Sequence, residues 1–350
     1  MSDAATAKTL ELYGKTRRRQ RLILFALLAA VLALPLVTIA IGPAAVSVGD
    51  VIGVIKSHIP GLDVDITWSQ NVDAIVWKTR LPRIISGLAI GAILGIAGAV
   101  MQAVVRNPLA EPYVLGVSSG ASTGAAAMII LFGSIASWSV GLAAFAGALV
   151  ATLFLLLVTG NSGSSLRLIL AGLAANFGFQ ALTNFIIFSS GTPEATQAVM
   201  FWMLGSLARA NWSQAVPLIV TALIFSVVVA LFGPVLDALS SGDRTAQSVG
   251  IEPTKARLAI LIPVSAVIGI AVASSGAIGF VGLIIPHVMR SIVGSSHRVL
   301  TLGCALAGAF FLVIADTFAR IAFAPIEMPI GVITGMVGVP FIVLLVRRMK

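Results

Sequence analysis

The sequence predicts an all-α, polytopic membrane protein with about ten transmembrane helices. Hydrophobic residues make up 58% of the 350-residue chain, and charged residues only 10%. Because soluble domains carry about 25% charged residues, this chain cannot build a water-facing surface of ordinary size. Apolar runs long enough to cross a bilayer as helices recur from Leu22 to Val346, separated by short polar breaks.

We expect the first apolar run to be a retained helix rather than a cleaved signal peptide. It is longer than the apolar region of a signal peptide, and its basic flank lies far from the first residue. We therefore expect residues 1–21 to form a basic cytoplasmic segment and residues 22–350 a single transmembrane domain. The ten predicted spans are 22–42, 82–105, 113–133, 138–158, 166–190, 212–232, 258–275, 278–294, 299–322 and 328–346.

Polar stretches separate some of these spans. The stretch "TPEATQAVMFWMLGSLARANW", between the fifth and sixth spans, is too polar to cross and predicts a short surface helix. Residues 43–81 and 233–257 form the longer polar connections. The second connection is bounded by Gly233-Pro234 and Pro253, which predicts two short helices joined by Gly250. A plain solvated loop fits its composition equally well.

Lysine and arginine are distributed unevenly between the two sides. With the N-terminus in the cytoplasm, sixteen of the 22 fall on the cytoplasmic side, which predicts two cytoplasmic termini. The net charge of +9 therefore reflects membrane orientation and contact with the lipid bilayer, and we expect no nucleic-acid partner. The outward set is Lys56, Lys78, Arg80, Arg83, Arg209 and Arg320.

Three of the outward charges cluster in "WKTRLPRIISGLAIG", at the entrance to the second span. Positive charge on this side opposes the usual orientation rule. Two interpretations remain open at this point: the side chains anchor lipid phosphates, or they dock an acidic external partner.

Glycines recur at a spacing of four in three of the predicted spans. This pattern lets membrane helices approach closely and predicts a dense bundle. The glycines are Gly87, Gly91 and Gly95, then Gly116, Gly120 and Gly124, then Gly331 and Gly335.

No catalytic or metal-binding constellation is evident. The "GKT" at Gly14–Thr16 lacks the upstream glycine of a phosphate-binding loop, because that position is Thr9. The three histidines do not have metal-ligand spacing. Only Asp316 and Glu327 lie in or beside a span, and Asp316 is expected to pair with Arg320, four residues on. Without a carboxylate relay, uphill transport would take its energy from a partner protein.

Six segments in order carry a family resemblance. They are "RLPR" at Arg80–Arg83, "MQAVVRNPLAEPYVLGVSSGA" at Met101–Ala121, "GAIGFVGLIIPHVMR" at Gly276–Arg290, "HR" at His297–Arg298, "ADTFAR" at Ala315–Arg320 and "MPIGVITGMVGVPF" at Met328–Phe341. Together they resemble the FecCD-type permease subunits of type II ABC importers, which move iron–siderophores, haem and cobalamin. Two positions depart from the pattern: Ser296 replaces an Asp, and Met328 begins an "LPVG"-like stretch.

The resemblance implies a type II ABC importer permease fold and a set of partners. A second copy or a related permease completes the dimer, and an extracytoplasmic binding protein delivers the cargo. Two cytosolic ABC ATPase subunits hold ATP and magnesium, so this chain is a transport subunit without a cofactor or an active site of its own. The expected location is the cytoplasmic membrane of a prokaryote.

The resemblance also implies roles for particular residues. It assigns binding-protein docking to Arg80, Arg83 and Arg320, and the translocation pathway to Met101, Met200 and Trp202. It assigns ATPase coupling within 233–257 to Gly242, Asp243, Ala246, Ser248, Val249 and Gly250. It assigns a cytoplasmic gate to Asn107, Pro108 and Leu109, with Ser165 and Leu166 as the facing pair.

The cargo is the least constrained part of the prediction. Few charges are available to line a pathway, which favours a large, partly apolar chelate over a bare ion. A ferric siderophore is the leading expectation because it is the family's commonest cargo, with haem and cobalamin as alternatives. A secondary transporter powered by an ion gradient is the competing class.

Overall fold

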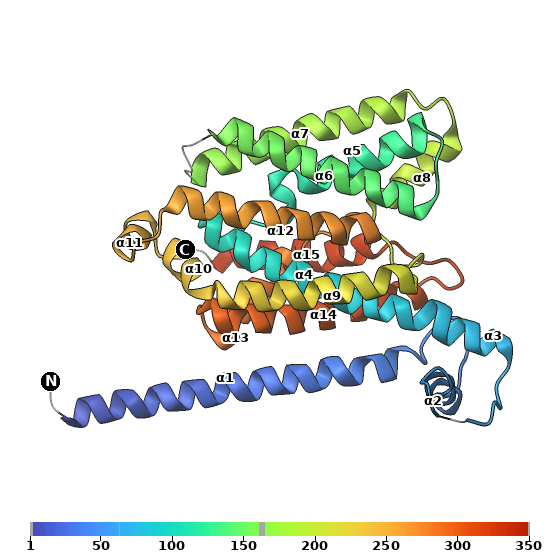
Figure 1. Cartoon of the computed structure of the whole chain (residues 1–350), viewed down its shortest axis with the longest axis horizontal. Helices are drawn as coiled ribbons and strands as arrows, with labels where there is room; N and C mark the ends of the chain where they lie inside the picture. The colour runs from blue at the N-terminus through green and yellow to red at the C-terminus, as the bar shows by residue number, and fades with distance from the viewer. Residues whose placement is uncertain (1–2, 63, 161–164, 349–350) are drawn as a thin grey trace.

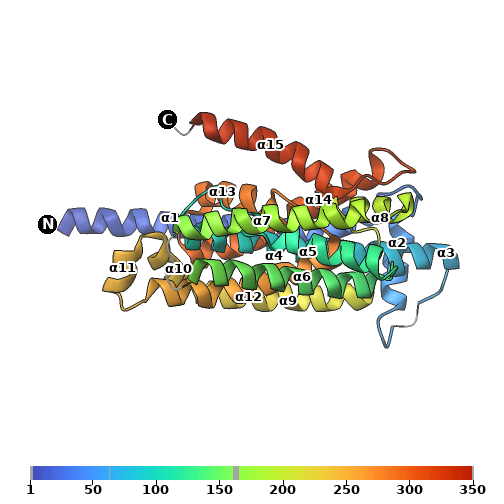
Figure 2. The same ribbon diagram turned by 90° about the horizontal axis from the view of Figure 1, so that it is seen from above.

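The computed structural model describes residues 3–62, 64–160 and 165–348, and every regular element in these ranges is helical. The long helices run roughly parallel to one axis (Figures 1 and 2), which confirms the predicted fold class. The elements are α1 Asp3–Thr38, α2 Val48–Ser57, α3 Gln70–Asp73, η1 Ala74–Arg80, α4 Leu81–Val105, η2 Pro112–Leu115, α5 Val117–Ala126, η3 Ala127–Leu131, α6 Ser137–Thr159, α7 Ser165–Phe188, α8 Pro193–Met203, α9 Trp212–Leu231, α10 Gly233–Ser240, α11 Asp243–Ser248, α12 Pro253–Ser275, α13 Val281–Val293, α14 His297–Ile321 and α15 Ile330–Arg348.

The ten predicted spans correspond in order to ten apolar helices in the described ranges. Seven of these helices are long and apolar enough to cross a membrane, and three are shorter, at Val117–Leu131, Val281–Val293 and Ile330–Leu345. The predicted surface helix is present as α8. By length and composition, the chain is a multi-pass membrane protein.

Two of the short helices begin inside the bundle rather than at its edge. Gly116 and Phe280 adopt left-handed backbone conformations just before α5 and α13. The two breaks are joined, because the Tyr113 hydroxyl accepts a hydrogen bond from Ile278 N at 2.9 Å. The Glu111 carboxylate accepts another from Phe280 N at 3.2 Å. Glu111, which lies in the connection between the second and third predicted spans, therefore anchors the start of α13.

Both chain termini lie at one end of the bundle, together with α10 and α11 (Figure 1). We call this end the terminal end. The other end, which carries α2, α3 and α8, is the distal end. This arrangement agrees with an even number of crossings.

Two helices are longer than the sequence predicted. α1 is continuous across residue 21, the boundary we expected for a separate N-terminal segment, because residues 8–21 are mostly good helix formers. At the distal end, α3, η1 and α4 follow one another without a break from Gln70 to Val105. Arg80 and Arg83 therefore lie on one continuous helical stretch.

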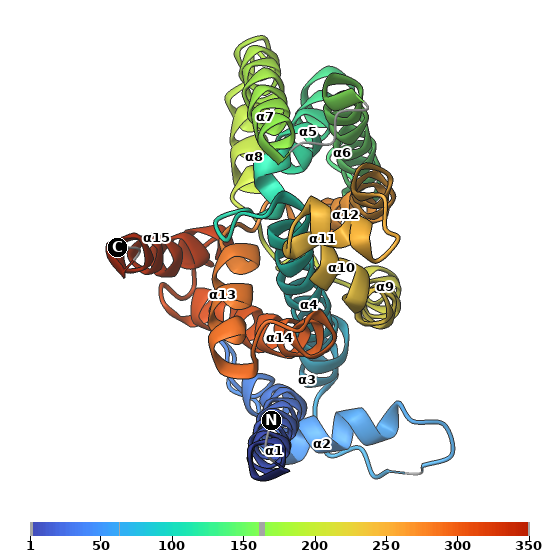
Figure 3. The same ribbon diagram turned by 90° about the vertical axis from the view of Figure 1, so that its left-hand side faces the viewer.

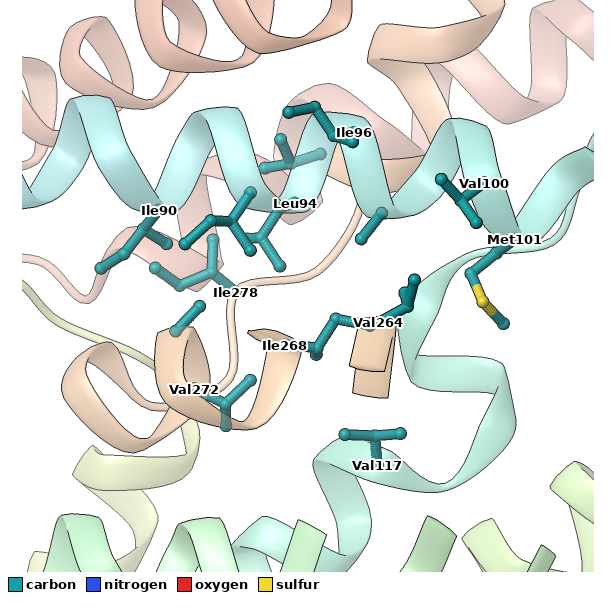
Figure 4. Close-up of a cluster of buried hydrophobic side chains, with 14 of the residues drawn as sticks. Ile90, Leu94, Ile96, Val100, Met101, Val117, Val264, Ile268, Val272 and Ile278 are labelled. Atoms are coloured by element: carbon teal, nitrogen blue, oxygen red, sulfur yellow. The ribbon is translucent and has the colours of Figure 1, made fainter. Parts of the chain in front are cut away.

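Small residues set the distances between the central helices. A Cβ on Gly91 of α4 would collide with the carbonyl of Gly308 on α14, and the reverse is also true. Gly120 of α5 and Gly147 of α6 meet in the same way. The predicted glycine packing is confirmed for these two spans. Apolar side chains of α4 and α12, including Leu94 and Ile268, fill the core beside them (Figure 4).

The last helix stands apart from the others. In Figures 2 and 3, α15 leans away from the bundle toward its C-terminal end. Met336, Val339 and Leu344 on this helix are exposed in the isolated chain. An apolar helix in this position offers surface to lipid or to another transmembrane segment.

Candidate functional site

The three predicted docking arginines converge on one pocket at the distal end. Arg80 belongs to η1, Arg83 to the first turn of α4 and Arg320 to the last turn of α14. With Glu327, they line a cavity of about 170 Å³. We call this cavity the arginine pocket. The sequence indicated outward charges in two distant segments, and the fold brings them together.

Arg83 forms the centre of the pocket. Its Nε lies 2.9 Å from Asp316 Oδ2, and its Nη1 lies 2.9 Å from Glu327 Oε2. The expected pair between Arg320 and Asp316 is present, with Nε and Oδ2 3.6 Å apart. Arg83 is nevertheless the closer partner of Asp316, so the charge of this carboxylate is balanced mainly from another helix. The sequence alone assigned that role to Arg320.

Arg80 and Arg320 hold the end of α1. Arg80 Nη1 donates to the carbonyls of Ile39 at 2.8 Å and Ala40 at 3.3 Å. Arg320 Nη2 donates to the carbonyl of Thr38 at 3.3 Å. The last carbonyls of a helix lack partners within the helix and carry partial negative charge, so cations stabilise them. This structural role was missed because no sequence pattern places residues 38–40 beside α4 and α14.

The mouth of the arginine pocket is formed by Glu327. Its side chain is 36% exposed, whereas that of Arg83 is 5% exposed. Glu327 lies in the connection between α14 and α15 and is not part of a helix. An external group approaching Arg83 would therefore meet this carboxylate first.

The 233–257 segment lies at the terminal end and forms two short helices, as predicted. The position of the joint was wrong, because α10 and α11 meet at Ser241 and Gly242, whose φ is 116°. Gly250, with φ of 79°, instead follows the end of α11. Both glycines have backbone angles that residues with a side chain rarely adopt.

Two aspartates attach this segment to the bundle. Asp243 accepts a hydrogen bond from Arg257 Nη2 and lies 3.4 Å from Arg106 Nη1. The hydrogen bond from Arg257, with the charges of both arginines, holds the pKa of Asp243 below its ordinary value of 3.8. Asp237 accepts a hydrogen bond from His297 N at 2.9 Å. The sequence analysis gave a role in this segment to Asp243 alone. It used Arg106 and Arg257 only to predict membrane orientation.

The tip of the 233–257 segment projects away from the bundle (Figure 1). Ala246 is buried beneath it, whereas Ser248, Val249 and Gly250 are exposed. The predicted coupling residues thus divide into an inner group that anchors the segment and an outer group that is free to contact a partner.

The predicted gate turn is present at the end of α4. Arg106 ends the helix with φ of 54°, and Asn107 Oδ1 accepts a hydrogen bond from Leu109 N at 2.9 Å. Leu166 is exposed on the first turn of α7. The role of this turn, with Ser165 and Leu166, as a cytoplasmic gate stays a prediction.

The predicted pathway residues do not share one surface. Met101 is 1% exposed and belongs to the apolar core (Figure 4), and its place in the pathway stays a prediction. Met200 and Trp202 lie on α8 at the distal end. Met200 is exposed and Trp202 is partly buried.

Comparison with known proteins settles the family. The sequence pattern of the FecCD transport family matches residues 22–348. The chain belongs to the FecCD transport family. It is therefore a permease subunit of a type II ABC importer, as the motif set predicted.

Sequence relatives of this member carry vitamin B12 names. The vitamin B12 import system permease protein BtuC of Salmonella paratyphi A is 41% identical over 284 residues, which cover 81% of this chain and 86% of the relative. The protein of the same name from Salmonella typhi is also 41% identical over the same shares of the two chains.

Two solved structures share the arrangement of helices. An inward-facing metal-chelate type ABC transporter aligns with a TM-score of 0.81 and 29% identity, over 93% of this chain and 99% of its own. PsaBC from Streptococcus pneumoniae, in complex with Fab, aligns with a TM-score of 0.53 and 14% identity, over 76% and 90%. At 14% identity, the second likeness concerns the fold alone.

Proposed function

We propose that this FecCD permease imports a corrinoid of the vitamin B12 type, with energy from ATP hydrolysed by partner subunits. The support is the 41% identity to two vitamin B12 import permeases over most of both chains. The sequence analysis ranked a ferric siderophore first among the cargoes, because it is the commonest cargo of the family. With these relatives, we rank a corrinoid first instead. The apolar bundle also suits a large organic chelate better than a bare ion.

The observation that carries the transport role is the placement of two kinds of surface at opposite ends. Three arginines converge at the distal end, and a compact polar segment projects from the terminal end. We assign the terminal end to the cytoplasm, because most lysines and arginines belong there. The arginine pocket then faces the side from which cargo arrives.

Three partners follow from this orientation. Acidic groups of an extracytoplasmic binding protein dock at the arginine pocket, where they compete with the partly exposed Glu327 for the donors of Arg83. A cytosolic ATPase receives the exposed tip at Ser248, Val249 and Gly250. The chain pairs with a second copy or a related permease, and the exposed apolar side of α15 is available for that contact.

Uptake measurements test the cargo. A strain without this gene is supplied with labelled cyanocobalamin, a ferric siderophore and haem in parallel, and then complemented with the chain. Loss of cyanocobalamin uptake alone, restored by the chain, is the expected result. Loss of siderophore uptake alone would return the cargo to the iron class, and loss of none would contradict both assignments.

A further inference from the structure

A second cavity lies at the terminal end, between α4, α10, α13 and α14. Its volume is about 190 Å³. Its lining includes two arginines and a histidine, and no carboxylate is among the lining residues. The residues are Gln102, Ala103, Arg106, Asn107, Pro108, Ser240, Arg290, Ser295 and His297. We call this cavity the basic pocket.

Arg290 is the unusual residue in the basic pocket. It is half-buried, and its Nη1 donates to Gln102 Oε1 at 3.0 Å. No Asp or Glu of the described chain lies within ion-pair distance of its guanidinium. A partly buried charge is costly without a counter-ion and further hydrogen bonds. Arg290 therefore retains donors and a charge that the described chain does not neutralise.

Two more basic side chains line the basic pocket. Arg106 approaches it from the end of α4 and also pairs with Asp243 of the 233–257 segment. His297 is buried, and its Nδ1 lies 2.6 Å from Asp237 Oδ1. Among the described residues, its Nε2 has no hydrogen-bond partner. Arg106 is thus connected to α11 through Asp243, and His297 to α10 through Asp237. An anion in the pocket would add a further link between these two residues.

The surroundings add positive potential. Gln20 Nε2 donates to the carbonyl of Val293 at 2.7 Å, which places α1 beside the turn between α13 and α14. The residues on either side of Gln20 in α1 are Arg19 and Arg21. These two arginines do not line the basic pocket, but cations nearby favour anions through their longer-range potential.

From these observations we propose that the basic pocket binds a phosphate group between Arg290 and Arg106. Arginine recognises the oxygens of phosphate through paired N–H donors. The volume falls below the range of about 300–1,000 Å³ typical of sites for larger organic ligands, and it suits one tetrahedral oxyanion. Bound phosphate would link the gate turn at Asn107 to α10 at Ser240. The proposal does not depend on the cargo.

The phosphate has two possible sources with the same chemistry. One is inorganic phosphate from solution. The other is the head group of an anionic phospholipid, since basic pockets between transmembrane helices bind such head groups on the cytoplasmic side. An acidic side chain of a partner subunit would instead overturn the proposal.

The first experiment uses the full chain in nanodiscs of phosphatidylcholine. Inorganic phosphate is titrated against potassium chloride of equal ionic strength while thermal unfolding is followed. We expect a saturable rise of Tm in phosphate. Arg290→Gln should weaken the apparent affinity about tenfold or more, because it removes charged hydrogen bonds. Arg298→Gln, an exposed neighbour outside the basic pocket, should behave as wild type.

The second arm replaces half of the lipid by phosphatidylglycerol and omits phosphate. If the head group is the natural source, this lipid raises the Tm of wild type and of Arg298→Gln, but not that of Arg290→Gln. Should neither phosphate nor phosphatidylglycerol stabilise wild type more than Arg290→Gln, the proposal is wrong. If Arg290→Gln does not fold, equilibrium dialysis of labelled phosphate with wild type decides, and binding no stronger than that of chloride rejects the site.

Discussion

Arg83 binds two carboxylates that come from different parts of the chain, Asp316 on α14 and Glu327 beyond it. Removing one member of a buried ion pair costs about 3–5 kcal/mol, because the remaining charge stays buried. Charge reversal at Arg83 would therefore disturb folding before it reports on docking. Glu327 is the better residue to change, since its carboxylate is partly exposed at the mouth of the arginine pocket.

Replacing Glu327 with Gln should strengthen docking of the cognate extracytoplasmic binding protein. The change keeps the shape of the side chain but removes a negative charge that competes for Arg83. One partly exposed interaction of this kind corresponds to an affinity gain of about fivefold. Surface plasmon resonance on the chain in nanodiscs measures the effect, and Glu194→Gln on α8 is the control. Weaker docking of Glu327→Gln would mean that the partner uses this carboxylate directly.

The attachment of the 233–257 segment through Asp243 should weaken at low pH. Because the pKa of Asp243 is lowered in the folded chain, its stabilising contribution is present above the ordinary value of 3.8. That contribution is lost as the pH falls from 3.8 through the lowered value. A spin label at position 249 should therefore become more mobile over this range in wild type. In Asp243→Asn it should be mobile already at neutral pH, and equal mobility in the two proteins would contradict the anchor.

At the scale of elements, the close contacts between α4 and α14 and between α5 and α6 depend on the absence of side chains. Membrane helices associate without a strong hydrophobic drive, so the distance between backbones decides how well they pack. The sequence pattern found the glycines of α4 and α5. It could not name their partners, because Gly308 and Gly147 do not extend a spacing-of-four series.

Gly91→Ala should destabilise the bundle, whereas Gly178→Ala should not. A Cβ on Gly91 meets the backbone of Gly308, while one on Gly178 of α7 meets nothing within 4 Å. Overpacking of this kind costs about 1–3 kcal/mol. Thermal unfolding in detergent compares the two variants. Equal Tm values would show that α14 can move away at no cost.

Changing Gly250 to Trp should uncouple ATP hydrolysis from transport while the chain stays folded. Gly250 is exposed, and its positive φ disfavours any side chain, so the tip of the 233–257 segment would change shape. Gly133→Trp is the matched control, since Gly133 also has a positive φ and open space but lies between η3 and α6. ATPase activity and uptake in proteoliposomes are compared. Normal uptake in Gly250→Trp would reject the coupling role.

At the scale of the whole molecule, two carboxylates within the helix bundle, Asp316 and Glu111, make contacts that stabilise the fold. Asp316 is paired with Arg83, and Glu111 accepts the hydrogen bond that holds the start of α13. Ion-coupled transporters place ionisable groups along the pathway to bind and release ions. These two carboxylates are thus held by structural contacts, and energy supply by partner subunits stays a prediction.

Uptake should therefore persist when the proton gradient is abolished. A protonophore added while cellular ATP is held constant should leave the initial rate of cargo uptake unchanged. The control is depletion of ATP with the gradient maintained, which should stop uptake. The reverse pattern would favour a secondary transporter.

The sequence by itself determined the helical membrane class, the order of ten spans and the family. It also singled out the arginines of the distal end and the 233–257 segment of the terminal end. These features follow from hydrophobic run length, charge placement and motifs, all of which are local or ordered along the chain. Tertiary structure alone decided which charges meet. Arg83 joins Asp316 and Glu327 across more than 200 positions, and Met101 enters the core. Such contacts depend on how helices far apart in sequence pack, and no local pattern encodes that.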